Sequence, residues 1–482
     1  MKRAIKVTRI VSPMLVPDSA RIVIRPFMPP NEERIRRVIA HVRSLDTREV
    51  HEEISRLTAE FGTYNRRLPA MFDRHFSLVE PYAGDGISTE CSRLIGAYFT
   101  CEYSFESAAL FNPSVVIHPD QSGVREGALR YIMSARSVGE GHVSSISFRT
   151  GMLNSNGTVT VEAVSRAVAR AELVKNARYE KKAFVDKLRE MGFWNNFMRE
   201  AILPLHDHFT LDELSATVAH TERSRDTQAD MLTAEKMIWL ARSNYEIQFD
   251  EHTDISERLI FPSSPTEQNG IEDARFVRFT DDDGSIVYYA TYTAYDGKII
   301  LPQIIETRDF RHFKMITLNG KVVENKGMAL FPRKISGRYA MLSRQDNENI
   351  YIMFSDHLHF WHEATLIARP AAPWEFIQIG NCGSPIETDA GWLVLTHGVG
   401  TLRKYSIGAM LLDKDDPTRV IGRLDEPLIS PEGNERIGYV PNVVYTCGSI
   451  VHAGRLIIPY GIADKAIGFA SVSLNDLLGQ LK

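Results

Sequence analysis

The chain has 482 residues and a formal net charge of −5, with 44% hydrophobic and 24% charged residues, as in an ordinary soluble globular protein. This charge balance provides no basic field, so a nucleic-acid partner is not expected. The four cysteines lack CxxC or Cys/His spacing, which gives no sign of zinc or of a disulfide scaffold and favours a reducing, cytoplasmic setting. No signal peptide and no run of about 18 apolar residues is found, so neither export nor membrane insertion is predicted.

Residues 31–60 carry a helical pattern near the N-terminus. Apolar residues recur there at three- and four-residue steps from Ile35 to Leu45. Asn31, with the two glutamates after it, fits an N-cap and a first helical turn. We therefore expect residues 1–100 to form a partly helical N-terminal extension.

A second block with helical composition lies at about 160–245. It includes "EAVSRAVARAELVKNARYEKKAFVDKLREMGF", is rich in Ala, Glu, Lys, Arg and Leu, and has almost no Gly or Pro. Short β-branched and aromatic runs separated by turn residues flank this block. The pattern predicts an α-helical insertion at 158–246, between a first β segment at 101–157 and a β-rich remainder at 247–482.

Short apolar strands recur after turns in the β-rich parts of the chain. They are "RYIMSARS" at 130–137, "VYYATYTA" at 287–294, "RYAMLSRQ" at 338–345, "WLVLTHGV" at 392–399 and "RLIIPYGI" at 455–462. The last four begin 51, 54 and 63 residues apart. A repeat of about 50 residues with several short strands per unit is typical of propeller blades. The alternative is a β protein in which apolar strands occur at irregular intervals.

The residues at the ends of these strands favour an all-β five-bladed β-propeller. Equivalent ends of inner strands in a propeller converge on one central funnel, where polar and aromatic groups would line a pocket. The terminal residues are Arg136, Tyr292, Arg344, His397 and Tyr460.

An acidic doublet, Glu272 and Asp273, lies in "NGIEDARFVRF", before an alternating β run. Neighbouring side chains of an extended segment point to opposite faces. The two acids are therefore not expected to act on one bond, whereas Asp273 and Arg275 should share a face. The plain alternative is a pair of acids solvated at a turn.

Six ordered motifs carry a family resemblance. They are "FNPSVV" at 111–116, "GIEDARF" at 270–276, "NKGMALFPRKISGRYAML" at 325–342, "GSPIETDAGWLVLTHGVG" at 383–400, "IGYVPNVVY" at 437–445 and "YGIADKAIGFA" at 460–470. Together they resemble glycoside hydrolase family 130, the mannoside phosphorylases and their relatives. The resemblance implies a five-bladed β-propeller, and the helical segments have no counterpart in the shortest family members.

Asp273 matches the acid of the family motif G-x-E-D-P-R, with Ala274 where proline is usual. The resemblance implies that this aspartate protonates the leaving oxygen through the mannosyl 3-hydroxyl while phosphate attacks with inversion, giving α-mannose 1-phosphate. An inverting glycosidase needs a second carboxylate to activate water, whereas phosphate is already an anion and needs a cationic cradle. Glu272 is then expected to be a structural or sugar-binding acid.

Cationic side chains near strand ends are the candidate phosphate ligands. Lys326 and His397 match the family's phosphate positions best, and Arg308 and Arg311 are both candidates for a further ligand. For Arg344 the alternative is an ion pair at the surface or between blades. A lone histidine such as His397 is more often a satisfied structural group.

Sugar hydroxyls need polar partners above an apolar or aromatic floor. The substrate-binding candidates are Asn112, Arg136, Glu272, Tyr292, Arg344, Tyr460 and Asp464. The resemblance places Asn112, Arg136 and Asp464 around the mannosyl ring. The two tyrosines could form its walls, although strand tyrosines are more often core. No metal and no organic cofactor is expected, and inorganic phosphate is the co-substrate.

Three functions stay open on the sequence. The first is an inverting phosphorylase acting on a β-mannoside oligosaccharide or glycoside. The second is an inverting β-mannoside hydrolase on the same propeller, and the third is a non-catalytic propeller binding module. The helical extensions also predict self-association into a homo-oligomer, and neither nucleic acid nor membrane is an expected partner.

Overall fold

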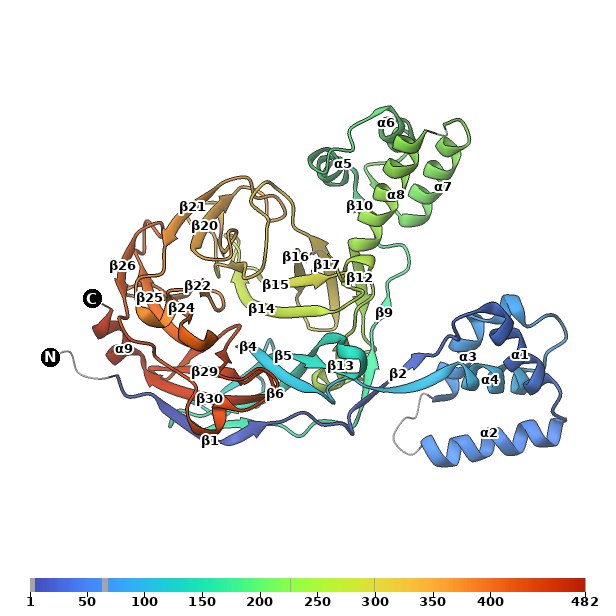
Figure 1. The fold of residues 1–482 in the computed structure, drawn as a ribbon, viewed down its shortest axis with the longest axis horizontal. Helices are drawn as coiled ribbons and strands as arrows, with labels where there is room; N and C mark the ends of the chain where they lie inside the picture. Colours follow the sequence, from blue (N-terminus) through green and yellow to red (C-terminus); the bar gives the residue numbers. More distant parts are fainter. Residues whose placement is uncertain (1–4, 63–67, 226, 299, 482) are drawn as a thin grey trace.

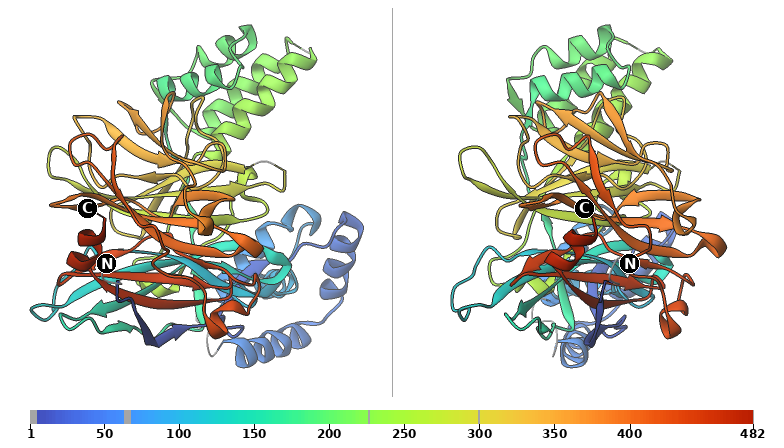
Figure 2. Two further views of the ribbon diagram at one scale, coloured as in Figure 1. Left: turned by 60° about the vertical axis from the view of Figure 1, so that its left-hand side comes forward. Right: turned by 90° about the vertical axis from the view of Figure 1, so that its left-hand side faces the viewer.

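The computed structural model describes residues 5–62, 68–225, 227–298 and 300–481. Within these ranges the chain is mostly β, and five sheets of four or more strands follow one another around a central region (Figure 1). Two helical units stand outside this β body, as two further views also show (Figure 2). No helix of the described ranges is both long enough and apolar enough to cross a lipid bilayer.

The first sheet along the chain has the strand order β3-β2-β8-β13-β6-β5-β4, with β7 paired to β6. Parallel pairing joins β2 to β8 and β8 to β13, so an N-terminal strand extends this sheet. The bounds are β2 (Ile22–Pro26), β3 (Thr100–Ser104), β4 (Ala109–Ile117), β5 (Leu129–Val138), β6 (Ser144–Leu153), β7 (Val159–Val161), β8 (Ala167–Arg170) and β13 (Arg258–Ile260).

The second sheet has the order β14-β15-β16-β17-β12-β9 and is buried on both faces. Alternate residues of β14 show this: Phe276 packs into the core shared with the first sheet, and Val277 into the core shared with the third. Side chains that alternate along this strand therefore pack into two different apolar cores. The bounds are β9 (Glu172–Leu173), β12 (Tyr245–Gln248), β14 (Ile271–Thr280), β15 (Ile286–Tyr295), β16 (Ile300–Thr307) and β17 (His312–Thr317).

The remaining sheets come from the C-terminal part of the chain. The third holds β18 (Ala329–Leu330), β19 (Tyr339–Ser343), β20 (Ile350–Ser355) and β21 (Ala364–Ala368). The fourth holds β22 (Gln378–Asn381), β23 (Ile386–Thr388), β24 (Gly391–Val399), β25 (Tyr405–Leu412) and β26 (Val420–Arg423). The fifth holds β27 (Val444–Tyr445), β28 (Ile450–His452), β29 (Arg455–Ile462), β30 (Ala466–Ser473) and β1 (Thr8–Leu15), and α9 (Leu474–Gln480) follows it.

The N-terminal region is only partly an extension, which corrects the expectation for residues 1–100. β1 pairs antiparallel with β30, so the two ends of the chain complete one sheet. The predicted helix at 31–60 is confirmed as two helices, and Asn31 caps the first by accepting from the backbone N–H of Arg34. The helices are α1 (Glu32–Arg43), α2 (Thr47–Phe61), α3 (Leu68–Ser77) and α4 (Thr89–Tyr98).

The helical insertion begins later than predicted. Residues 159–180 hold β7, β8, β9 and β10 (Tyr179–Glu180), where helix was expected from about 160. Pairing of β8 between β2 and β13 supplies ladder hydrogen bonds that outweigh the helical propensity of an Ala-rich segment. The helices are α5 (Lys181–Glu190), α6 (Asn196–Ile202), α7 (Leu211–Glu222) and α8 (Gln228–Ser243); β11 (His208–Phe209) pairs with β10.

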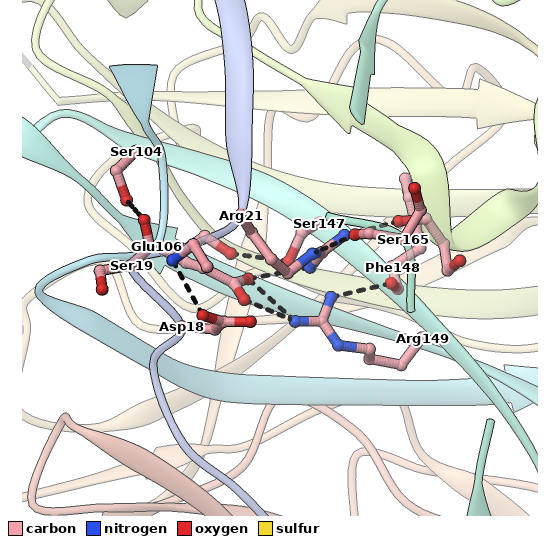
Figure 3. A network of polar contacts seen from close by, with 12 residues as sticks. Asp18, Ser19, Arg21, Ser104, Glu106, Ser147, Phe148, Arg149 and Ser165 are labelled. Carbon is pink, nitrogen blue, oxygen red and sulfur yellow. Dashed lines mark hydrogen bonds and ion pairs between the residues drawn. The ribbon is translucent and has the colours of Figure 1, made fainter. Parts of the chain in front are cut away.

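A buried ion-pair network ties Arg21, the residue before β2, to other segments of the first sheet (Figure 3). Arg21 Nη1 lies 3.0 Å from Glu106 Oε2, and Arg149 Nη2 lies 2.8 Å from the same oxygen. Arg21 also donates to the carbonyls of Ser165 and Ser256 at 3.1 and 2.7 Å. The network therefore joins segments far apart in the sequence and fixes the entry of the N-terminal chain.

Candidate functional site

The candidate site is built on two strands that each contain a β-bulge. β4 and β14 each carry a register shift, and Asn112 and Asp273 lie in these shifts with φ of 48° and 54°. Asn and Asp tolerate this left-handed conformation better than other side chains. The amide Nδ2 of Asn112 donates to Asp273 Oδ1 at 2.7 Å, so the two bulges bring strands of different sheets together.

The bulge also makes the prediction of opposite faces wrong. Arg136, from β5, contacts both acids: Nη2 lies 2.7 Å from Glu272 Oε1, and Nη1 lies 3.4 Å from Asp273 Oδ1. Strict alternation holds only for regular extended backbone, and the positive φ of Asp273 interrupts it. Lys326 completes the cluster, because its Nζ donates to Glu272 Oε2 at 2.8 Å. We call Arg136, Glu272, Asp273 and Lys326 the acid–cation cluster.

Arg275 is buried behind the cluster and contacts the backbone of Asp273. The prediction that Asp273 and Arg275 share a face of the strand is therefore not met at an exposed surface. Arg275 is 2% exposed, and its Nη1 donates to the backbone carbonyl of Asp273 at 2.9 Å. Its other donors reach the carbonyl of Cys382 at 2.7 Å and the hydroxyl of Tyr445 at 2.8 Å. The arginine thus fixes the bulge against the fourth and fifth sheets, a role that the alternation of the sequence did not indicate.

Opposing influences set the pKa of Asp273. Burial raises it, but the charges of Arg136, Arg275 and Lys326 and the hydrogen bond from Asn112 outweigh burial and hold it below its usual value. Without a ligand, the carboxyl group of Asp273 is therefore ionised at neutral pH.

Asp464 joins the same electrostatic group. It lies in the turn between β29 and β30 with φ of 49°. Burial and the charge of Asp273 raise its pKa to about 6, against the opposite influence of Arg136 and Arg403. The two aspartates are thus shifted in opposite directions.

A second polar group lies beside Lys326. Arg344 Nη1 and His397 Nε2 are 2.8 Å apart, and His397 is 1% exposed. Burial, together with Arg344 and Arg275, lowers the pKa of His397 well below its usual value, so the ring is neutral. His397 therefore orients Arg344 and supplies no positive charge of its own.

Asn381 is a residue that the sequence analysis missed. It is fully buried at the end of β22, and its Nδ2 donates to the carbonyl of Gly327, next to Lys326. Its Oδ1 and the Nε of Arg344 are buried without a hydrogen-bond partner in the described part of the chain. Buried polar atoms are normally paired, so these two mark the neighbourhood of a ligand.

Arg308 and Arg311 do not join the site, which corrects their assignment to phosphate. β14 runs away from Asp273, β15 returns and β16 runs out again, so residues after Thr307 lie at the far end of the second sheet. There Arg308 Nη1 donates to a backbone carbonyl of β15, and Arg311 Nε to the carbonyl before the Asp250 turn.

Tyr292 and Tyr460 do not form walls of the site either. Both are 2% exposed and belong to apolar cores. The hydroxyl of Tyr292 donates to Glu267 Oε1 at 2.7 Å, and that of Tyr460 to Glu435 Oε1 at 2.6 Å. Buried tyrosines usually pair their hydroxyls in this way, and the structural alternative holds for both.

The described residues contain no group of three or more His, Cys, Asp or Glu side chains arranged to hold a metal ion. The chemistry available at the cluster is that of a carboxyl group beside a guanidinium and an ammonium. Such a set can pass a proton and bind an oxyanion.

Comparisons with known proteins agree with the resemblance. A 1,2-β-oligomannan phosphorylase from Thermoanaerobacter sp. (strain X514) is 38% identical over 225 residues, which cover 45% of this chain and 73% of the relative. A β-1,2-mannobiose phosphorylase from Listeria innocua is 30% identical over 262 residues, covering 52% and 70%. A β-1,4-mannooligosaccharide phosphorylase from Ruminococcus albus is 36% identical over 190 residues, covering 36% and 56%.

A family profile described as β-1,4-mannooligosaccharide phosphorylase matches residues 228–482. This range covers more than half of the chain and includes Asp273, Lys326, His397 and Asp464. The protein belongs to glycoside hydrolase family 130.

Proposed function

We propose that the chain is an inverting glycoside phosphorylase that cleaves β-mannosides with inorganic phosphate and releases α-mannose 1-phosphate. One observation carries the proposal: the carboxyl group of Asp273 is held by Asn112 and Arg136, and the ammonium of Lys326 lies in the same cluster, paired with Glu272. The phosphorylase names of the relatives that are 30% or more identical support the same reaction class.

Asp273 is placed to act as the acid. Its Oδ1 is anchored by Asn112 and Arg136, and the structure gives its Oδ2 no bond to a described residue. In the proposed step a phosphate oxygen forms a bond to the anomeric carbon while the glycosidic C–O bond breaks. The leaving oxygen takes the proton of the mannosyl 3-hydroxyl, which is replaced by the proton of Asp273.

Phosphate binding would also prepare this acid. The ligand-free cluster holds the pKa of Asp273 below its usual value through the positive charges around it. A phosphate anion beside Lys326 and Arg344 offsets those charges, which raises the pKa of the carboxyl group toward the protonated form that the reaction needs. Binding of the co-substrate and readiness of the acid are thereby coupled.

The phosphate cradle consists of Lys326 and Arg344, oriented by His397 and Asn381. The Lys326 side chain is 36% exposed, so its ammonium is within reach of a solute. In the ligand-free state it is paired with Glu272 at 2.8 Å, and an incoming phosphate competes with that carboxylate. Glu272 also pairs with Arg136, so it remains anchored when Lys326 turns to phosphate.

Hydrolysis is the second candidate. An inverting hydrolase needs a second carboxylate to activate water, and Glu272 lies in the same cluster as Asp273. Its two ion pairs keep Glu272 occupied, which favours the phosphorylase.

We further propose that the β body is a five-bladed β-propeller with this site at its axis. Five sheets of four or more strands in the described ranges, arranged around a central region, support this architecture. The pairing of β1 with β30 supports closure of the last blade by the N-terminal strand, because both chain ends then share one sheet.

The test is incubation with β-1,2- and β-1,4-linked mannobiose, with and without inorganic phosphate. Mannose 1-phosphate formed only with phosphate, with an α anomeric signal by NMR, is the expected result. Free mannose released equally in both buffers would replace the phosphorylase with the hydrolase. No product from either substrate in either buffer would leave a binding module.

A further inference from the structure

A large cavity lies far from the acid–cation cluster, between the helical insertion and the β body. It has a volume of about 820 Å³ and is lined by residues of α5, of the ends of β15 and β16, of β19 and β20 and of the loop after β20. A neighbouring cavity of about 360 Å³ shares Glu180, Ala183, Glu306 and His359 with it, so the space continues beneath α5. We call this space the insertion cleft.

The insertion cleft is distinct from the catalytic site. Tyr289 and Glu306, which line it, face each other across β15 and β16. The cluster end of the same sheet is marked by the pairing of Glu272 with Thr293. Thr293 lies four residues further along β15 than Tyr289, a separation of roughly 13 Å at the rise of an antiparallel strand.

One wall is a polar helix face and the other carries aromatic rings. Lys182, Asp186 and Glu190 follow one another at four-residue steps along α5 and line the cleft. Opposite them, Phe354 and Phe360 are only half-buried. Binding sites for sugars combine these features, because rings pack against C–H faces while polar groups bond the hydroxyls.

The charge of the lining argues against an anionic ligand. Six carboxylates line the larger cavity in the described chain, against three lysine or arginine side chains. The carboxylates are Glu180, Asp186, Glu190, Glu306, Asp356 and Glu363, and the cations are Lys182, Arg189 and Arg338. A carboxylate oxygen accepts hydrogen bonds from hydroxyl groups, whereas an acidic lining repels phosphate. A neutral, hydroxyl-rich ligand fits this lining best.

The cleft is held open by a fixed contact between the two units. Lys187, on the buried face of α5, donates to Asn244 Oδ1 and to both the carbonyl and the hydroxyl of Thr317, each at 2.9 Å. These bonds join α5 and the end of α8 to β17. Because both walls are positioned without a ligand, binding in the cleft would not have to order the helical unit.

We propose that the insertion cleft is a second, non-catalytic binding site for the neutral sugar chain of a β-mannooligosaccharide. The choice of a mannoside rests on the proposed function of the chain. A site of this kind gives the helical insertion a role: it retains long substrates near the enzyme while their ends reach the acid–cation cluster.

The test separates the two sites by using the inactive Asp273→Asn enzyme, which binds without turnover. Calorimetric titration with a β-1,2-linked mannotetraose is expected to show two sites per chain. Ala183→Trp, added to Asp273→Asn, fills the cleft from α5 and is expected to leave one site. The matched control, Ala229→Trp, places the same ring on an exposed position of α8 and should keep both.

Activity on mannobiose distinguishes failure of this proposal from failure of the proposed function. With Asp273 intact, Ala183→Trp should keep kcat and KM on mannobiose within about twofold, because the cleft lies outside the catalytic cluster. The proposal would be overturned if the titration showed only one binding site in Asp273→Asn, or if both binding sites remained after Ala183→Trp was added. A third outcome is that the titration shows two sites, that Ala183→Trp loses one of them, and that the enzyme does not phosphorolyse mannosides. That outcome would support the cleft as a binding site and refute the proposed reaction.

A second variant covers the case in which Ala183→Trp does not fold, as judged by its circular dichroism. Phe360→Ala removes a half-buried ring from the opposite wall and adds no bulk. It should weaken the second site at least tenfold, and an unchanged affinity would overturn the proposal.

Discussion

Two clusters of arginines and carboxylates in this molecule use the same chemistry for different ends. In the Arg21–Glu106–Arg149 network the side chains are 1–4% exposed, and two guanidinium groups enclose one carboxylate (Figure 3). In the acid–cation cluster Arg136 is 19% exposed, Glu272 13%, and a second acid and an ammonium are added.

The difference lies in which polar atoms lack a protein partner. Both oxygens of Glu106 accept from arginine, and the network is closed. At the acid–cation cluster and its neighbour Asn112, Arg136 Nε and Asn112 Oδ1 are buried without a hydrogen-bond partner among the described residues. A closed network stabilises a fold, whereas an open one keeps bonding capacity for a ligand.

The sharpest test of this contrast is Asp273→Asn. The amide keeps the shape but cannot donate the proton that the leaving oxygen requires, so kcat/KM should fall about 10²–10⁴-fold. The melting temperature should stay within a few degrees, because the neighbouring hydrogen bond from Asn112 is retained in part. Mannose 1-phosphate release and thermal unfolding measure the two quantities.

Glu272→Gln is the matched control for that substitution. It removes a charge from the same cluster but not the proposed acid, and its rate should fall less than that of Asp273→Asn. The reverse order of the two rates would move the acid to Glu272.

In the closed Arg21–Glu106–Arg149 network we expect the opposite result, which is a loss of stability with activity retained. Glu106→Gln leaves two buried guanidinium groups without their counter-charge, and loss of one partner of a buried pair costs about 3–5 kcal/mol in the free energy of unfolding. Catalysis per folded molecule should be retained.

Urea titration and active-site counting measure these two quantities. Glu53→Gln, which breaks an exposed pair with Arg56 on α2, should lower the free energy of unfolding far less than Glu106→Gln does. If Glu106→Gln slowed turnover while leaving stability intact, the network would have to be counted as part of the site.

Lys326→Met tests the oxyanion side of the open cluster. A charge-assisted hydrogen bond contributes about 1.5–3 kcal/mol, so the KM for phosphate should rise roughly 10–100-fold, with a smaller change for the mannoside. Lys326→Arg should recover part of the loss. Arg308→Met, at the far end of the second sheet, is the control and should change neither KM; an equal effect of both variants would refute the cradle.

Sequence patterns predicted much of the fold because they report local geometry. The alternation in β14 and β15 and the Asn31 cap act within a few residues, and both appear in the structure. The helix predicted for 159–180 was wrong because strands of this segment pair with distant parts of the chain: β8 pairs with β2 and β13, and β9 pairs with β12. Composition alone does not contain that pairing.

In the site, too, features set by local sequence were predicted and features set by distant contacts were not. The motif around Asp273 located the acid, but alternation predicted its direction wrongly because a bulge with φ of 54° reorients it. Arg308 was predicted to bind phosphate because it lies near the end of a strand. Only the pairing of β16 with β15 shows that this strand end is at the side of the sheet away from Asp273. Asn381 carried no local signal, since its role depends on Lys326 and Arg344 from another sheet.

The smallest expected effect concerns Asp464 and the sign of its pH dependence. Its pKa is raised from 3.8 to about 6 in the folded chain, so the folded state binds more protons than the unfolded state between these values. Stability from this group is therefore present at low pH and lost as pH rises through about 6. Asp464→Asn removes the loss and should be roughly 1–2 kcal/mol more stable than the parent at about pH 8, a gain that shrinks by about pH 5. Urea unfolding at the two pH values measures the difference. A gain that grew toward acid would mean that the carboxyl group is stabilised in its ionised form, and Asp464 would then belong with the closed network.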